Sequence, residues 1–242
     1  MLRYLDCSQT SLIEKLNRYL CKTGRNTLPD DGACFGLALV WLQKMAEGKV
    51  EWFYNTIDTI IQLPDHRFDE IEILVEKFFA LVEWAQNSRK YVEGLTQEDI
   101  AKILDIRWVE TSLFAGSSQE MHKRLRERRH PIMHVMTANE HAIAVFQQGM
   151  YYYVYDSNNP SGRASVFLNK ELAVAQVKYC LYDSFDIKAP ETLGIQIYSI
   201  RPNHDAFVAP QDPTLMDIEA FNEPDSDSAP LTPTTFSSCT IL

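Results

Sequence analysis

The sequence predicts an α+β fold in which a helical first half is followed by a mostly antiparallel sheet. Up to about residue 93, apolar residues recur every three or four positions, which is the spacing of amphipathic helices. From residue 106 onward, short runs rich in β-branched and aromatic residues are bounded by Gly, Asn or Pro, as strands are. Gln148-Gly149 between two of these runs is typical of a hairpin turn, so at least that pair is antiparallel.

The helices of the first half follow from apolar periodicity and from the residues that interrupt it. They are expected over residues 8–21, from 34 to beyond 45, over two stretches between 48 and 93 that are separated by Leu63-Pro64-Asp65, and over 96–104. Asp30, Asp31 and Gly32 predict a turn and N-cap ahead of the second helix. Thr96 and Asp99 have the spacing of a capping box at the start of the last one.

Strands are expected in the second half, and two polar residues lie at their ends. The expected strands cover residues 106–114, 131–137, 141–147, 151–155 and 193–200. His141 opens the third strand, and Asp156 directly follows the fourth. Because these two strands form the predicted hairpin, His141 and Asp156 should lie at the same end of it, within reach of each other.

Length and composition indicate one enzyme-sized domain with an additional tail. The chain has 242 residues, of which 45% are hydrophobic, enough for a well-buried domain of about 200 residues. We assign this domain to residues 1–202. Residues 203–242 carry seven acidic residues, five prolines and no lysine or arginine, and such a segment is expected to be disordered because it cannot bury enough apolar surface.

Charge, hydropathy and cysteine usage exclude several function classes. A net charge of −10 makes nucleic acid a poor partner, since binding phosphates requires clustered basic residues. No apolar run approaches the ~20 residues of a membrane span, and the N-terminus lacks the apolar core of a Sec signal. The five cysteines have no metal-like spacing, so we expect no metal, no cofactor and a reducing compartment.

Cys34 is the candidate nucleophile. It is expected in the first turn of a buried helix, where the unpaired N–H groups and the positive dipole end favour a thiolate. The thiolate of Cys34 would attack a carbonyl carbon, His141 would hold the ion pair and later protonate the leaving amine, and Asp156 would fix the imidazole tautomer. The backbone N–H of Cys34 and one polar side chain would form the oxyanion hole.

Two motifs resemble one family of enzymes. These are Gly32-x-Cys34-x-Gly36-Leu37-x-x-x-Trp41, and His141-Ala142 combined with Tyr155-Asp156-x-Asn158. The order Cys, His, Asp is similar to that of papain-like cysteine proteases, and the motifs resemble the YopT and AvrPphB effector proteases in particular. The resemblance covers about residues 30–42 and 140–162. It implies a papain-like fold and a bacterial effector delivered without a Sec signal into a host cell, with Cys34 as nucleophile, His141 as base and Asp156 as orienter.

The sequence departs from the papain-like pattern at the oxyanion side chain. Such enzymes usually place Gln or Asn five or six residues before the nucleophile, and here those positions are Pro29 and Leu28. Asn26 is the nearest amide, so it is assigned this role.

The last four residues, Cys239-Thr240-Ile241-Leu242, fit a prenylation signal, and the terminal Leu favours geranylgeranyl. A host prenyltransferase would then be a partner, and the lipid would bring the protein to host membranes. One prenyl chain holds a protein only marginally, so a second contact is needed. A basic cluster could meet anionic lipid or an acidic substrate, or could simply be a solvated helix face: Lys123, Arg124, Arg126, Arg128 and Arg129.

The leading prediction is therefore a monomeric, prenylated cysteine protease that cleaves a eukaryotic host protein and is membrane-associated or cytosolic in the host cell. The same three groups would also serve a glutamine deamidase or a transglutaminase, which attack a side-chain amide. A third alternative is a catalytically inactive binding module that its tail brings to membranes.

Overall fold

The computed structural model describes residues 6–24, 27, 32–87, 106–116, 121, 132–186 and 193–202. The helical part comprises α1 (Gln9–Lys22), α2 (Cys34–Ala46), α3 (Val50–Gln62), the 3₁₀ helix η1 (Asp65–Ile71) and α4 (Glu72–Asn87). The four helices predicted up to residue 93 are confirmed, and the helix expected over 96–104 lies outside the described residues. Pro64 precedes η1, so the break between α3 and α4 falls where the sequence places it.

The second half contains β1 (Ile106–Gly116), β2 (Ile132–Ala138), β3 (His141–Gln148), β4 (Tyr151–Asp156), β5 (Ser165–Phe167) and β6 (Leu193–Pro202). All five expected strands are confirmed. The structure adds β5, the helix α7 (Lys170–Leu181) and the short 3₁₀ helix η2 (Asp183–Phe185). The side chain of Asn169 caps α7 by accepting a hydrogen bond from the N–H of Glu171.

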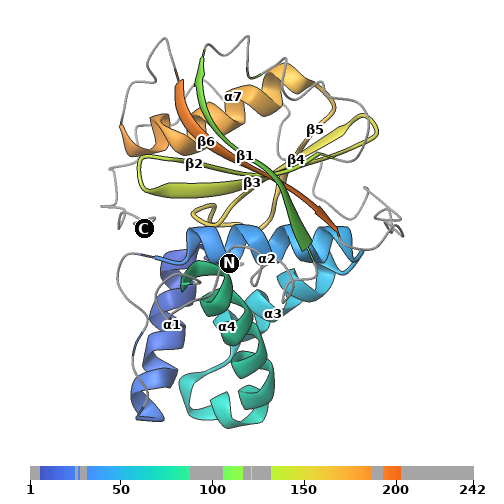
Figure 1. The fold of residues 1–242 in the computed structure, drawn as a ribbon. Helices are drawn as coiled ribbons and strands as arrows, with labels where there is room; N and C mark the ends of the chain where they lie inside the picture. Colours follow the sequence, from blue (N-terminus) through green and yellow to red (C-terminus); the bar gives the residue numbers. More distant parts are fainter. Residues whose placement is uncertain are drawn as a thin grey trace, which may run out of the picture.

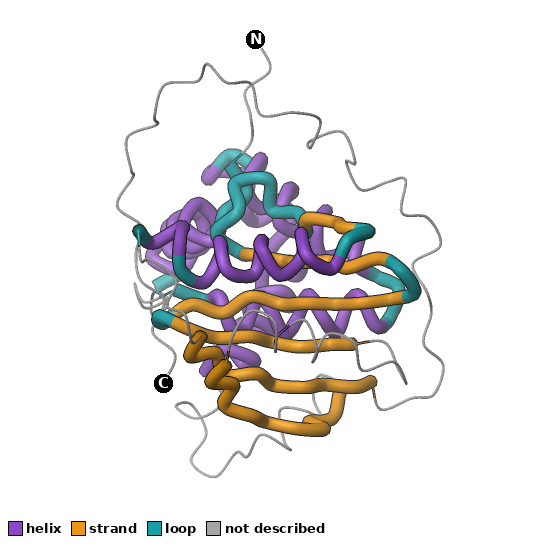
Figure 2. Tube along the Cα trace, turned by 90° about the horizontal axis from the view of Figure 1, so that it is seen from above, coloured by secondary structure: helices purple, strands orange, loops and turns teal. Residues whose placement is uncertain are grey.

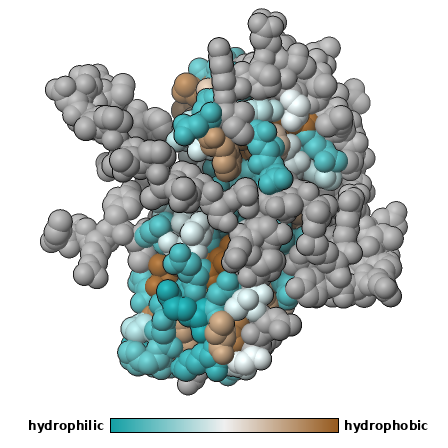
Figure 3. Space-filling model, turned by 90° about the vertical axis from the view of Figure 1, so that its left-hand side faces the viewer, coloured by the Kyte–Doolittle hydropathy of each residue, from teal (hydrophilic) through white to brown (hydrophobic). Residues whose placement is uncertain are grey.

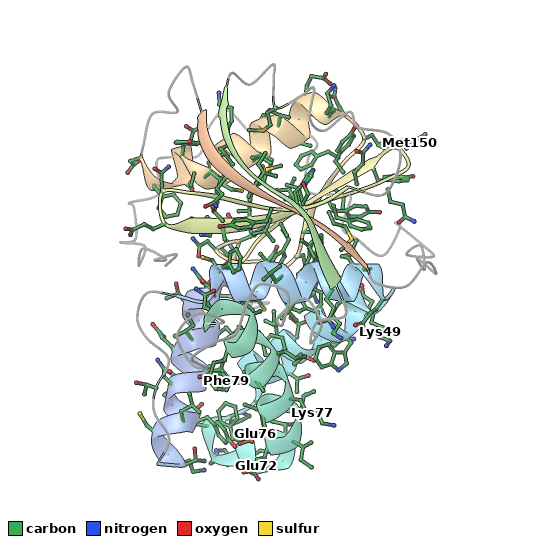
Figure 4. All side chains as sticks on the ribbon, in the orientation of Figure 1. Lys49, Glu72, Glu76, Lys77, Phe79 and Met150 are labelled. Carbon is green, nitrogen blue, oxygen red and sulfur yellow. The ribbon has the colours of Figure 1, made fainter. Side chains whose placement is uncertain are left out.

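The strands form one antiparallel sheet in the order β1-β6-β2-β3-β4-β5. Figure 2 shows these strands side by side from above. The predicted hairpin of β3 and β4 is confirmed, with Gln148 paired to Tyr151 across the turn. Met150 at this turn is 66% exposed, and its side chain points away from the sheet in Figure 4.

The sheet is covered on both faces, because alternate residues of its strands pack against different helices. On β3, Ala142, Ala144 and Phe146 belong to the core shared with α1–α4, whereas Ile143 and Val145 belong to the core shared with α7. Figure 1 shows the resulting layers, with the helical part on one side of the sheet and α7 on the other. This accounts for the nearly continuous apolar sequence of β3.

Helix α2 is the central helix, buried between the sheet and the remaining helices. The ring of Trp41 stacks on Tyr155 of β4 with a centroid distance of 5.3 Å, and its Nε1–H donates to the hydroxyl of Tyr54 at 2.9 Å. A Cβ atom on Gly36 would lie 2.4 Å from the carbonyl oxygen of Val82, so glycine is what lets α2 approach α4 this closely.

These observations confirm the predicted α+β class, with a helical part packed on an antiparallel sheet and Cys34 as the first residue of α2. One detail of the prediction is wrong. The N-cap of α2 is Ala33, which has no side-chain acceptor and makes no capping hydrogen bond. Asp30 and Asp31 lie outside the described residues.

No described helix is both long enough and apolar enough to cross a bilayer. In the face drawn in Figure 3, the described part of the surface is mainly hydrophilic, with small separated hydrophobic areas.

Candidate functional site

His141 is held at the start of β3 by a tight turn. Asn139 and Glu140 connect β2 to β3 with φ angles of 49° and 59°, the left-handed conformation of a two-residue hairpin. The side chain of Asn139 donates to the carbonyl oxygen of Leu181 at 2.6 Å, which fixes the turn to the end of α7. The backbone geometry thus leaves His141 little freedom of position.

Asp156 meets His141 as the sequence predicts. It pairs with Ile143 in the hairpin register, two residues beyond His141. The Nε2 atom of His141 lies 2.8 Å from Oδ1 of Asp156, within hydrogen-bond distance. The prediction that these two side chains lie at one end of the hairpin is confirmed.

The carboxylate of Asp156 is buried but well supplied with donors. Burial works to raise its pKa, yet the charge and hydrogen bond of His141, the N–H of Asn158 and the thiol of Cys180 together hold the pKa below its ordinary value. The Asn158 N–H donates at 2.8 Å, and Nε2 of Gln176 donates to the sulfur of Cys180 at 3.3 Å. Asp156 therefore stays ionised near neutral pH, as a group that orients an imidazole must.

His141 has one ring nitrogen engaged and one that is not. Its side chain is fully buried, and the ring of Phe185 lies edge-on with a centroid distance of 5.3 Å. Nε2 faces Asp156, and Nδ1 has no hydrogen-bond partner among the described residues, Cys34 included. Leaving a buried ring nitrogen without a hydrogen bond lowers the stability of the fold, so a functional reason is expected. Nδ1 of His141 is available to bind a group that enters the site.

Cys34 lies at the N-terminus of α2, where the sequence places it. The residue is fully buried. Cys7, Cys21 and Cys180 are free thiols. At the position of Cys34, the unpaired N–H groups of the first helical turn favour the thiolate over the thiol.

A buried glutamine that the sequence analysis did not identify joins the two halves of the site. Oε1 of Gln9 accepts from the backbone N–H of Ala33 at 3.2 Å, and its Nε2 donates to Oδ1 of Asn158 at 2.6 Å. Asn158 in turn donates its N–H to Asp156. The start of α2, which carries Cys34, is therefore tied to the loop that follows Asp156.

The sequence did contain a signal for Gln9. It precedes Leu12, Leu16 and Leu20 at spacings of three, seven and eleven residues, so it is a polar residue on the apolar face of α1. Buried polar groups on such a face require a specific partner.

Other predicted site residues cannot be placed. Three of the predicted sites lie outside the described residues. They are the oxyanion residue Asn26, the prenylation residue Cys239, and the basic cluster of Lys123, Arg124, Arg126, Arg128 and Arg129. Within the described part of the chain, no three His, Cys, Asp or Glu side chains are arranged to hold a metal ion.

Comparison with solved structures finds several similar chains, including the following two. The crystal structure of the Pseudomonas avirulence protein AvrPphB aligns at 14% identity with a TM-score of 0.39, over 70% of this chain and 91% of that one. The ubiquitin-specific protease encoded by the murine cytomegalovirus tegument protein M48, solved with a ubiquitin-based suicide substrate, aligns at 10% identity with a TM-score of 0.40, over 69% of this chain and 76% of that one. No family model and no curated protein sequence matches this chain.

Proposed function

We propose that this protein is a papain-like cysteine protease, delivered as a bacterial effector, that cleaves a eukaryotic host protein. Cys34 is the nucleophile, His141 the base and Asp156 the orienting carboxylate. The observation that carries this proposal is the buried hydrogen bond between Nε2 of His141 and Asp156. This bond leaves Nδ1 of His141 available to a group in the site. Gln9 links the start of α2, where Cys34 lies, to the same end of the sheet.

In this mechanism the reduced sulfur of Cys34 transfers its proton to Nδ1 of His141 and attacks the carbonyl carbon of the substrate. The backbone N–H of Cys34 belongs to the first turn of α2, where no helical carbonyl is available to it, and it is suited to stabilise the oxyanion. His141 then protonates the departing amine, and water attacks the acyl-enzyme to release the acid and regenerate the thiol.

The burial of Cys34 and His141 favours one alternative. A closed site is also what an inactive membrane-targeted binding module would show. The two functions differ in the reactivity of the reduced protein, because only the enzyme activates its thiol.

Iodoacetamide at mildly acidic pH distinguishes these functions. In the reduced protein, alkylation of Cys34 at pH 6 should exceed that of the exposed Cys21 by at least about tenfold, since only a paired thiolate persists at that pH. Cys7 should remain unlabelled, because burial and the neighbouring Asp58 raise the pKa of its thiol to about 12. Equal slow labelling of Cys34 and Cys21 would contradict the enzyme and support the binding module.

Mass spectrometry of candidate host proteins separates the three reactions that the site could perform. Fragments indicate proteolysis, a gain of about one dalton on glutamine indicates deamidation, and an isopeptide product indicates transfer. The Cys34→Ala protein must lose whichever reaction is seen. A Cys34→Ala protein that still processes its substrate would rule the proposal out.

We further propose that geranylgeranylation of Cys239 brings the protein to host membranes, with the basic cluster around Arg126 as a second contact. A Cys239→Ser variant expressed in eukaryotic cells should move from the membrane fraction to the cytosol. A variant that remains on membranes would refute anchoring by the tail and leave the enzymatic proposal untouched.

A further inference from the structure

Gln9 makes three hydrogen bonds that all concern the site. In addition to the two side-chain bonds to Ala33 and Asn158, its own backbone N–H donates to the carbonyl oxygen of Ser157 at 2.6 Å. The residue is only 3% exposed. A buried amide side chain satisfied at both ends is rigid, because each end would lose a partner if the other moved.

The direction of each bond is fixed by chemistry. A backbone N–H can only donate, so the atom of Gln9 that faces Ala33 must be the oxygen. Nε2 is then left to donate to Asn158, whose side-chain oxygen must face Gln9. The amide orientations along this path therefore have one self-consistent solution.

The bridge crosses the division between the two halves of the site. Cys34 belongs to α2, whereas His141 and Asp156 belong to the sheet hairpin, and Gln9 comes from a third element, α1. Oε1 of Gln9 accepts from the backbone N–H of Ala33, the residue directly before Cys34. Small shifts of α2 against the hairpin would stretch these bonds.

We infer that Gln9 is a positioning residue that sets the separation between the sulfur of Cys34 and the imidazole of His141. This inference rests on the proposed function, since it assigns a role within that site. The side-chain hydrogen bonds of Gln9 go to Ala33 and Asn158. Gln9 acts through Ala33 on one side and through Asn158 and Asp156 on the other.

The test measures alkylation of Cys34 by iodoacetamide against pH in the reduced full-length chain. Thiolate sulfur displaces iodide in this reaction, so its pH profile reports the thiolate population. Gln9→Met keeps the size of the side chain but removes both bonds. We expect a rate at least tenfold lower at pH 6 and a midpoint shifted upward toward that of an ordinary thiol.

The matched control is Gln43→Met. Gln43 is another buried glutamine, in α2 itself, and its Oε1 accepts no hydrogen bond from the described residues. We expect its pH profile to lie within twofold of the wild type. A Gln9→Met profile equal to that of Gln43→Met would overturn the inference.

Asn158→Ala provides a second variant, because it breaks the far end of the bridge without altering α1 or α2. It should also slow alkylation, and the double variant Gln9→Met/Asn158→Ala should be no slower than the slower single variant. Additive losses would mean two independent roles and would overturn the inference.

The proposed function has its own control in the same experiment. If wild-type Cys34 behaves as an ordinary thiol and His141→Ala changes nothing, both the proposed function and the role of Gln9 fail. If His141→Ala abolishes the low-pH reactivity while Gln9→Met preserves it, only the role of Gln9 fails.

Discussion

Replacing Asp156 with alanine should destabilise the folded protein measurably at neutral pH. Oδ1 of Asp156 accepts hydrogen bonds from Nε2 of His141 and from the N–H of Asn158, both at 2.8 Å. The substitution leaves two donors in a buried region without an acceptor, at about 1–2 kcal/mol each. The free energy of unfolding should therefore fall by about 2–4 kcal/mol.

Urea denaturation at pH 7 with reductant present measures this loss. With a slope near 2 kcal/mol per M, the midpoint should fall by about 1–2 M. The control Asp183→Ala removes an exposed carboxylate close to the site in sequence, and its free energy of unfolding should change by no more than about 0.5 kcal/mol.

The pH dependence adds a second check. The pKa of Asp156 is lowered in the folded state, so its contribution is complete above the unfolded value of about 4 and is lost as the pH falls through the lower folded value. The gap between wild type and Asp156→Ala should therefore shrink below about pH 4. An unchanged midpoint at pH 7, or a gap that widens toward pH 3, would refute this reasoning.

Two further substitutions test the packing that positions α2. Gly36→Ala should lower the free energy of unfolding by about 2 kcal/mol or more, because the new Cβ meets the backbone oxygen of Val82. In the control Gly194→Ala the new Cβ has open space, so its melting temperature should be nearly that of the wild type. Equal melting temperatures for the two would show that α2 and α4 separate easily. The hydroxyl of Tyr54 accepts from the Trp41 Nε1–H at 2.9 Å and from the Ala164 N–H at 3.3 Å. Tyr54→Phe removes this acceptor and should lower the free energy of unfolding by about 1–3 kcal/mol. The exposed Tyr179→Phe should leave the unfolding free energy unchanged, and a similar result for Tyr54→Phe would contradict the buried bonds.

Local sequence patterns were sufficient for most of the elements and for the hairpin that carries His141 and Asp156. Helices α1 and α3 each bury one face, so their apolar spacing is visible in the sequence. His141 and Asp156 could be paired because a short turn fixes the hairpin register. This part of the site needed no information from distant residues.

Helix α7 was not predicted, for a physical reason. Leu168 just before it is 64% exposed, and Leu172 and Tyr179 within it are 56% and 53% exposed. Large apolar residues therefore stand on its outer side as well as on its buried side, which removes the contrast that reveals an amphipathic helix. The strand β5 is only three residues long and shows no alternation.

The cap of α2 also lay beyond local reasoning. The nearby aspartates suggested a cap of the usual kind, but in the first turn of α2 the N–H of Gly36 donates to Oε1 of Gln86, which is 50 residues away in sequence. The burial of Cys34 and His141 likewise depends on how separate elements pack, and single-sequence patterns do not specify that packing.

The place of β6 in the sheet has a consequence for synthesis of the chain. It is the last strand along the described chain, yet it lies between β1 and β2, and it is the neighbour with which β1 pairs. On the ribosome, β1 must wait until residues 193–202 emerge, while the β3–β4 hairpin can already form. During that interval, unpaired strand edges are open to pairing with other nascent chains, so a cell that makes this protein must shield them.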